Sequence, residues 1–315
     1  MIKILKCIFL LVAIAGSGCT SNKVDQENHF LNAQTAFSNG DHDTAIVEAT
    51  RSIEQKIEVE DAYLIRGMSW SLLSEHDNAI SDLTKVIQIN PNRSEAFYNR
   101  GVVHGNENEF DKELIEYNQA IKLNPSFTEA LFNRGVVLAE LGEFELATSD
   151  YDSVIAIQPN HTLAYVNRSG TYCKLGKYEE AINDCDFAIE LSPDLDLPFF
   201  NRGYAYLIMK ENERAIDDFS RVIELNAVHT EVYYYRGAGY VELQRFDDAI
   251  KDLSKAIEIN SNMEVAYSKR GYAYSRLEQC QLAIADFDKA IELNPGDPNL
   301  HFMRTYILNK LEKSQ

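Results

Sequence analysis

The chain is poor in the residue patterns from which catalytic and metal sites are usually built. Its seven histidines and five cysteines are scattered along 315 residues. No two histidines have the i, i+4 spacing beside an acid that marks a zinc site on a helix. No glycine-rich phosphate loop, nucleophile elbow or Cys–His arrangement is present. These absences predict no enzymatic activity, no metal site and no cofactor.

Positive charge is scarce as well. Lysine and arginine number 30 against 49 aspartates and glutamates, so the formal net charge is −19. No cluster of lysines and arginines offsets this excess locally, and a surface of this sign repels phosphate backbones. We therefore expect no nucleic-acid partner. The acidic surface either serves solubility or attracts a basic partner.

Long hydrophobic runs are limited to one stretch near the N-terminus. Lys3 and Lys6 precede an apolar run from Cys7 to Ala15, and the small residues 16–18 lead to Cys19. This order is typical of a cleavable secretory signal, and the run is too short for a stable membrane-spanning helix. Residues 1–18 are therefore predicted to be a signal peptide.

The end of this segment resembles the bacterial lipobox, although Gly16 stands where that motif prefers leucine. The resemblance implies cleavage before Cys19, a diacylglycerol on its sulfur and an acyl chain such as palmitate on its amine. Residues 19–25 would then be a short linker. By resemblance to enterobacterial sorting, Thr20 in place of Asp implies the outer membrane of a bacterial cell envelope. An ordinary secreted protein is the alternative.

Three cysteines remain in the mature chain, an odd number at unrelated spacings: Cys173, Cys185 and Cys280. Cys173 and Cys185 would lie near opposite ends of a helical hairpin, too far apart for a disulfide. We expect all three to be small buried hydrophobic residues.

What the sequence does contain is a repeat of 34 residues. Arg-Gly pairs recur at this period or twice this period, and an alanine follows most of the glycines after twelve residues. Prolines close the repeats in the same register. The pairs begin at Arg66, Arg100, Arg134, Arg202, Arg236 and Arg270, and the prolines are Pro91, Pro125, Pro159, Pro193 and Pro295. This period is typical of a helix–turn–helix array.

The repeats resemble the tetratricopeptide repeat over residues 26–297, which makes eight repeats of two helices, A and B. They begin at Gln26, Glu60, Ser94, Thr128, Thr162, Asp196, Thr230 and Glu264. The resemblance implies an all-α, right-handed superhelical solenoid of antiparallel helix pairs that binds other proteins. Residues 298–315 begin with Pro298 after Asp297, and we expect them to form a C-terminal capping helix.

Seven repeats carry an arginine at position seven and an acid sixteen residues later. Antiparallel helices bring these positions to similar heights, so we expect charge-assisted pairs that fix hairpin stacking, within a repeat or with its neighbour. Recognition of a ligand by these arginines is the alternative. The pairs are Arg66/Asp82, Arg100/Glu116, Arg134/Asp150, Arg168/Asp184, Arg202/Asp218, Arg236/Asp252 and Arg270/Asp286.

Helix A of each repeat is expected to line a concave groove. At position six, four successive repeats carry an amide: Asn99, Asn133, Asn167 and Asn201. At position five lies an apolar stripe: Tyr98, Phe132, Val166, Phe200 and Tyr234. A ladder of amides at one pitch can bind the backbone of an extended peptide, which predicts a peptide groove here. The alternative is that these residue types are simply common at these positions in the family.

The third repeat departs from the pattern at three positions. His104 replaces an aromatic residue, Gly105 follows it, and Glu113 stands where the other repeats have alanine. We expect His104 and Glu113 to form a hydrogen-bonded pair that makes this hairpin the softest joint of the array.

These features together predict a lipid-anchored scaffold that binds extended segments of partner proteins in the cell envelope. The rival interpretation is an accessory module for a cell-wall or glycan-processing enzyme that touches glycan directly. Glycan binding requires an exposed aromatic platform, for which Phe200, Tyr204 and Tyr234 are the candidates.

Overall fold

The computed structural model describes residues 28–225 and 230–313. Within these ranges every regular element is an α-helix, and consecutive helices pack in pairs. The predicted all-α fold class is therefore confirmed. The predicted signal peptide, Cys19 and the linker of residues 19–25 lie outside the described residues.

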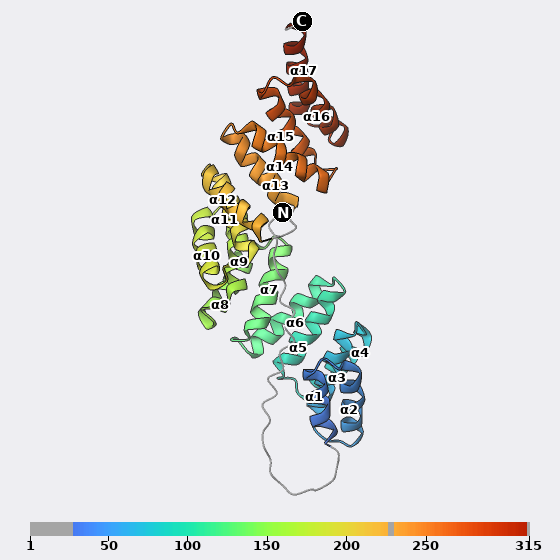
Figure 1. Ribbon diagram of the computed structural model, residues 1–315. Helices are drawn as coiled ribbons and strands as arrows, with labels where there is room; N and C mark the ends of the chain where they lie inside the picture. Colours follow the sequence, from blue (N-terminus) through green and yellow to red (C-terminus); the bar gives the residue numbers. More distant parts are fainter. Residues whose placement is uncertain (1–27, 226–229, 314–315) are drawn as a thin grey trace. The chain divides into compact units, whose positions relative to one another are not determined.

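The chain divides into two compact units, and the first includes residues 28–159. It contains four hairpins, coloured blue to green in Figure 1, and each helix A packs on helix B of its own repeat. Its helices are α1 His29–Ser38, α2 His42–Glu54, α3 Val59–Leu72, α4 His76–Ile89, α5 Ser94–Asn106, α6 Phe110–Leu123, α7 Thr128–Glu140 and α8 Phe144–Ile157.

The second unit begins at Asn160. Four further hairpins are followed by one unpaired helix, which packs on α16. The helices are α9 Thr162–Lys174, α10 Tyr178–Leu191, α11 Asp196–Ile208, α12 Asn212–Glu224, α13 Thr230–Glu242, α14 Phe246–Ile259, α15 Glu264–Arg276, α16 Cys280–Leu293 and α17 Pro298–Lys313.

Glycine at position eight allows helix A to approach helix B of the same repeat. A Cβ atom added to Gly101 would lie 2.8 Å from Cε1 of Tyr117, and one added to Gly203 would lie 3.0 Å from Cε1 of Phe219. A side chain at Gly101 or Gly203 would overlap the aromatic ring of helix B, because well-packed interiors have no room for such overlap. The recurring Arg-Gly pair therefore marks the place where the two helices cross.

Each of the seven predicted arginines lies against its predicted acid. In the fourth repeat, Nε of Arg134 donates to Oδ2 of Asp150 at 2.8 Å, and Nη2 donates to Oδ1 at 2.6 Å. In the third repeat, Nη2 of Arg100 donates to Oε1 of Glu116 at 2.8 Å. The two-bond geometry of the fourth repeat recurs in five other pairs: Arg66/Asp82, Arg168/Asp184, Arg202/Asp218, Arg236/Asp252 and Arg270/Asp286.

The arginines also reach back to the preceding hairpin through Nη1. In Arg236 this atom donates to the hydroxyl of Ser220 on α12 at 3.0 Å. Equivalent bonds go from other arginines to residues of the preceding helix B: Thr50, Thr84, Asn118, Asp186 and Ser254. Each of these arginines thus joins its own helix B to the neighbouring one, so the pairs act both within a repeat and between repeats.

α17 continues the pattern as a helix A without a partner helix. Leu300 and Ile307 are buried against α16, and Nε of Arg304 donates to Asp288 on that helix. The opposite face of α17 exposes Phe302 and Tyr306. Across residues 28–225 and 230–313, no helix combines the length and the apolar character needed to cross a membrane.

Candidate functional site

The amides predicted to form a ladder lie in the protein interior. None is more than 7% exposed: Asn99, Asn133, Asn167 and Asn201. Nδ2 of Asn133 donates to the hydroxyl of Tyr98 at 3.2 Å, and Nδ2 of Asn201 donates to the backbone oxygen of Val166, also at 3.2 Å. The expectation of an exposed ladder is corrected, because these two amides connect one helix A to the preceding helix A.

Most of the predicted apolar stripe is buried too: Tyr98, Phe132, Val166 and Phe200. The ring of Phe200 lies 6.0 Å, between centroids, from Phe219 at position 24 on helix B of the same repeat, and 5.9 Å from Tyr235 on the next helix A. Tyr234 is half-buried. At these positions the helices stack closely enough for the rings to become core, so the stripe does not line a groove.

The acids of the arginine pairs are buried as well, which supports the structural role predicted for the pairs. Asp184 of the fifth repeat is 6% exposed, and Asp252 of the seventh is 3% exposed. Both oxygens of each carboxylate accept a hydrogen bond from the arginine of the same repeat. The other acids are equally inaccessible: Asp82, Glu116, Asp150, Asp218 and Asp286. Asp184 and Asp252 thus hold the arginine of their own repeat from inside the hairpin.

The same close packing removes the predicted aromatic platform for glycan. Phe200 is buried, and Tyr204 lies edge-on against Tyr235 with a centroid separation of 5.4 Å. A sugar-binding platform needs a ring face open to solvent, and Phe200 has none. The interpretation that Phe200, Tyr204 and Tyr234 form such a platform is corrected.

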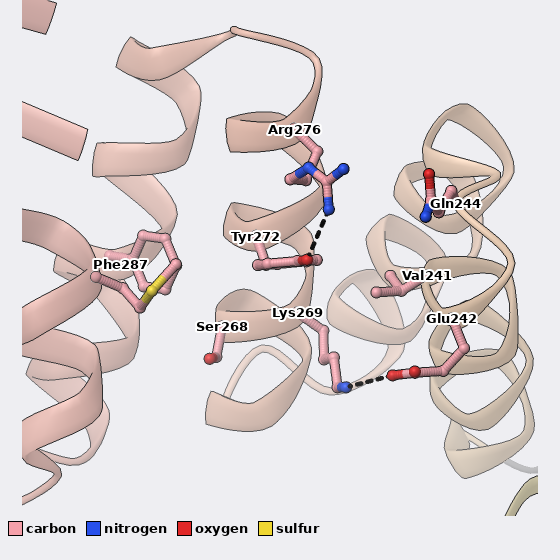
Figure 2. A pocket seen from close by; sticks show the side chains of 9 residues that line it. Val241, Glu242, Gln244, Ser268, Lys269, Tyr272, Arg276 and Phe287 are labelled. Carbon is pink, nitrogen blue, oxygen red and sulfur yellow. Dashed lines mark hydrogen bonds and ion pairs between the residues drawn. The ribbon is translucent and has the colours of Figure 1, made fainter. Parts of the chain in front are cut away.

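A cavity of about 440 Å³ lies instead in the last hairpins of the second unit (Figure 2). Side chains of α13, α15, α16 and α17 line it, together with Gln244 of the turn after α13: Val241, Glu242, Ser268, Lys269, Tyr272, Arg276, Phe287 and Met303. In repeat 8, Ser268, Lys269, Tyr272 and Arg276 occupy positions five, six, nine and thirteen. In tetratricopeptide repeats these positions face the groove. The four residues that occupy them in repeat 8 were not among the residues predicted to line the groove.

Repeat 8 has a serine at position five, and this serine lines the cavity. In repeat 6 that position is Phe200, whose ring fills the space against Phe219. Phe287 occupies the equivalent place on α16, yet the residue opposite it is Ser268, which has no ring. The missing ring leaves room beside Phe287, and this break in the aromatic pattern is the signal from which the site was predictable.

Two cations stand on the α15 wall of the cavity. Nζ of Lys269 lies 3.7 Å from Oε1 of Glu242, a loose and partly exposed ion pair. Nη1 of Arg276 donates to the hydroxyl of Tyr272 at 2.9 Å, and its guanidinium lies 5.1 Å from the ring centroid of Phe246. Figure 2 shows both cations on the same side of the helix. The site therefore combines an apolar wall with two cations, Lys269 and Arg276, and one carboxylate, Glu242.

The predicted pair of His104 and Glu113 does not form. Nδ1 of His104 lies 2.8 Å from Oε2 of Glu109, while Oε1 of Glu113 accepts a hydrogen bond from the hydroxyl of Tyr117 at 3.0 Å. Glycine is needed at position 105 because a Cβ there would lie 2.6 Å from the carboxyl carbon of Glu113. The carboxylate of Glu113 thus occupies the space beside Gly105, and the imidazole of His104 points to Glu109 in the turn between the two helices.

The three cysteines of the repeats are buried and unbridged. Burial raises the pKa of the Cys173 thiol to about 12 and that of Cys185 well above its ordinary value. Thiols of this kind are protonated and inert at neutral pH, which agrees with a packing role.

The chain matches the tetratricopeptide repeat family over much of its length. Family models described as tetratricopeptide repeats match residues 94–127, 116–162, 198–229, 230–263 and 265–297, and a model described as a TPR repeat matches residues 171–210. The chain therefore contains tetratricopeptide repeats, as the resemblance predicted. No curated protein sequence matches it.

Solved structures share the fold at low sequence identity. The APC/C hetero-tetramer Cut9–Hcn1 is 16% identical with a TM-score of 0.61 over 89% of this chain, which spans only 55% of that chain. A tetratricopeptide repeat protein from Parabacteroides merdae ATCC 43184 is 19% identical, with a TM-score of 0.58 and coverage of 79% of this chain and 98% of that one. YrrB, described as a TPR protein with an unusual peptide-binding site, is 21% identical, with a TM-score of 0.51 and coverage of 61% and 97%.

Proposed function

We propose that the protein is a lipid-anchored scaffold that holds an extended segment of a partner protein in the cavity of its last hairpins. The observation that carries this proposal is the cavity of about 440 Å³ beside Ser268, at a position that aromatic rings fill in other repeats. Helical-repeat proteins bind partners on surfaces of this kind, and YrrB, which shares the fold, is described as having a peptide-binding site.

The chemistry of the cavity indicates the kind of segment that fits it. Val241, Phe287 and Met303 form a wall on which an apolar side chain can lose its contact with water. Lys269 and Arg276 stand seven residues apart, two turns along the same face of α15. A carboxylate placed between them gains charge-assisted hydrogen bonds. The expected ligand is therefore an extended segment with an apolar residue beside an acidic one.

Filling the cavity tests this function directly. Ser268→Phe places a ring where repeat 6 has Phe200, so the cavity closes while the local fold is kept. In a crosslinking pull-down from membranes, we expect recovery of the partner to fall at least tenfold. The melting temperature should not fall, because the ring buries apolar surface against Phe287.

Ser261→Phe is the matched control, since Ser261 is exposed in the turn before α15 and lies outside the cavity. This variant should recover the partner as well as the wild type does. Equal recovery by Ser268→Phe, with the ring shown to be buried, would place partner binding elsewhere on the protein.

The anchor is the second part of the proposal, and it is supported by the sequence of residues 1–25 alone. Lipid chains on Cys19 would hold the repeats close to the membrane of a bacterial cell envelope, most simply the outer membrane, because several acyl chains together give stable anchoring. Cys19→Ser should move the protein to the soluble fraction of the envelope. Sedimentation of this variant with membranes after a high-salt wash would contradict the assignment.

A further inference from the structure

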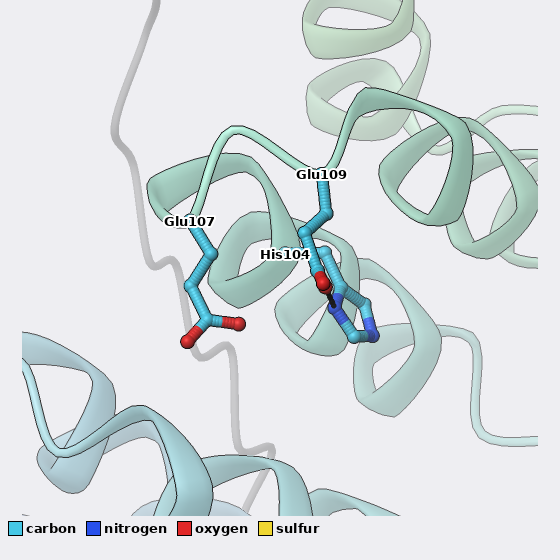
Figure 3. Close-up of side chains that lie close together, drawn as sticks. All are labelled: His104, Glu107 and Glu109. Carbon is cyan, nitrogen blue, oxygen red and sulfur yellow. Dashed lines mark hydrogen bonds and ion pairs between the residues drawn. The ribbon is translucent and has the colours of Figure 1, made fainter.

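In the first unit, away from the cavity, one histidine and two glutamates converge at the turn between α5 and α6 (Figure 3). His104 lies on the last turn of α5, Glu107 follows its final residue, and Glu109 precedes α6. One ligand atom from each of the three lies within 4.8 Å of the other two. All three are residue types that bind metal ions through nitrogen or oxygen.

Two of these residues are peculiar to this repeat. At position eleven, where repeat 3 has His104, the other repeats from the second onward carry large apolar or aromatic residues: Trp70, Leu138, Tyr172, Tyr206, Tyr240 and Tyr274. At position fourteen, where repeat 3 has Glu107, they carry Leu73, Leu141, Leu175, Met209, Leu243 and Leu277. Two hydrophobic residues have thus been replaced by two metal-binding types at one turn.

A second histidine reaches the same place from the neighbouring repeat. Nδ1 of His76, the first residue of α4, lies 3.4 Å from Oε1 of Glu107. His76 also breaks the pattern, because its position seventeen is an aromatic residue in four of the later repeats: Phe110, Phe144, Tyr178 and Phe246. His76 therefore contacts one member of the cluster, Glu107, from the neighbouring hairpin.

We propose that His76, His104, Glu107 and Glu109 form a zinc site that joins the second repeat to the third. Zinc is bound by four nitrogen, sulfur or oxygen ligands at about 2.0–2.2 Å in tetrahedral geometry, so neighbouring ligand atoms lie about 3.3–3.6 Å apart. The 3.4 Å between His76 Nδ1 and Glu107 Oε1 already has this value. His76 lies outside the group of three whose ligand atoms are all within 4.8 Å of one another, so zinc binding requires the His76 side chain to move toward His104 and Glu109.

His104 and Glu109 must adjust as well. Their 2.8 Å contact is a hydrogen bond, and zinc binding replaces its proton and lengthens it to a ligand–ligand distance. Nζ of Lys112 donates to both carboxylate oxygens of Glu109, at 2.8 and 2.9 Å. The Lys112 side chain is 58% exposed, so it can rotate into solvent when a divalent ion supplies the charge. In the absence of zinc, the carboxylate of Glu109 is thus paired with the ammonium group of Lys112.

Zinc titration of the full-length protein tests the site, with Zn²⁺ alone as the probe. We expect saturable binding of one Zn²⁺ per chain and a rise in melting temperature on binding. X-ray absorption should show only nitrogen and oxygen ligands at about 2.0–2.1 Å. Absence of saturable binding, or a zinc–sulfur distance of about 2.3 Å that points to a cysteine, would overturn the proposal.

The double change His104→Tyr with Glu107→Leu restores the pattern of the other repeats, so this variant is expected to fold. Its affinity for Zn²⁺ should fall at least a hundredfold, and zinc should no longer raise its melting temperature. Glu143→Gln, at the position of Glu109 in the next repeat, is the matched control and should bind zinc as the wild type does. Affinity of the double variant within twofold of wild type would overturn the assignment.

Discussion

Repeats 6 and 8 place different residues at the same two positions of helix A. Phe200 and Asn201 occupy positions five and six of repeat 6, where both are buried. Ser268 and Lys269 occupy the same positions of repeat 8, where both line a cavity. The backbone context is a helix A of thirteen residues in both cases. In repeat 8 a cavity thus lies at a packing position that a ring fills in repeat 6.

The ring of Phe200 also serves the repeat that follows it. It touches both Phe219 of its own hairpin and Tyr235 of the next helix A, so removing it would loosen two repeats. Ser268 lines the cavity together with Phe287 of α16 and Met303 of α17, and it carries no ring that could bridge two hairpins as Phe200 does.

The largest expected difference is between the thiol reactivity of Cys173 and that of a cysteine introduced at position 268. Burial raises the pKa of Cys173 to about 12, so at pH 8 only about one molecule in ten thousand carries the reactive thiolate. A half-exposed cysteine introduced by Ser268→Cys should keep a pKa of about 8.5. We expect iodoacetamide to modify it roughly a thousandfold faster than Cys173, measured by mass spectrometry of the native protein. Similar rates at the two positions would show that Ser268 does not face an open cavity.

The next largest difference is expected in the free energy of unfolding when the position-five residues Phe200 and Ser268 are each replaced by alanine. Phe200→Ala removes a buried ring and leaves a hole that the neighbours cannot close, which costs about 3–5 kcal/mol. Ser268→Ala changes a small side chain at the cavity wall and should cost less than about 0.5 kcal/mol. Urea denaturation followed by circular dichroism gives both values. Equal losses would mean that the two positions are packed alike.

A smaller difference is expected at position six. Asn201→Ala removes hydrogen bonds to the backbone oxygen of Val166 and to the hydroxyl of Ser169, at 3.2 and 2.9 Å. The backbone oxygen of Val166 keeps the hydrogen bond from the Ser169 hydroxyl at 2.7 Å, so the loss of the two bonds from Asn201 should cost about 1 kcal/mol. Lys269→Ala loses only a loose surface contact with Glu242 and should stay within about 0.5 kcal/mol of wild type. A destabilising Lys269→Ala would assign the lysine to structure and not to ligand binding.

Much of the fold was predictable because its determinants are local or periodic. The Arg-Gly pair repeats every 34 residues, and it predicted both the helix crossing at Gly203 and the ion pair of Arg202 with Asp218. A glycine or proline acts on its own stretch of backbone, and a fixed register between two helices of one hairpin carries over to every copy. Such features can be found by counting residues.

The candidate site was less predictable, since it depends on where side chains end. Its position in the repeat predicted that Asn201 lies on the groove wall, but the stacking of neighbouring repeats buries this side chain completely. The repeat positions also predicted a pair of His104 with Glu113 across the hairpin, whereas the imidazole of His104 contacts Glu109. Residue spacing specifies neither the stacking that buries Asn201 nor the rotamer that directs the imidazole of His104.

The sequence by itself determined the all-α class, the period and the arginine–acid pairs, because helix formation and close crossing depend on residues within one 34-residue copy. Only the tertiary structure decided that Phe200 is core while Ser268 opens a cavity, and that His76 meets Glu107 from another hairpin. Exposure and convergence of this kind depend on atoms contributed by neighbouring repeats. These contacts join residues of different hairpins, so the residues of one 34-residue copy do not specify them.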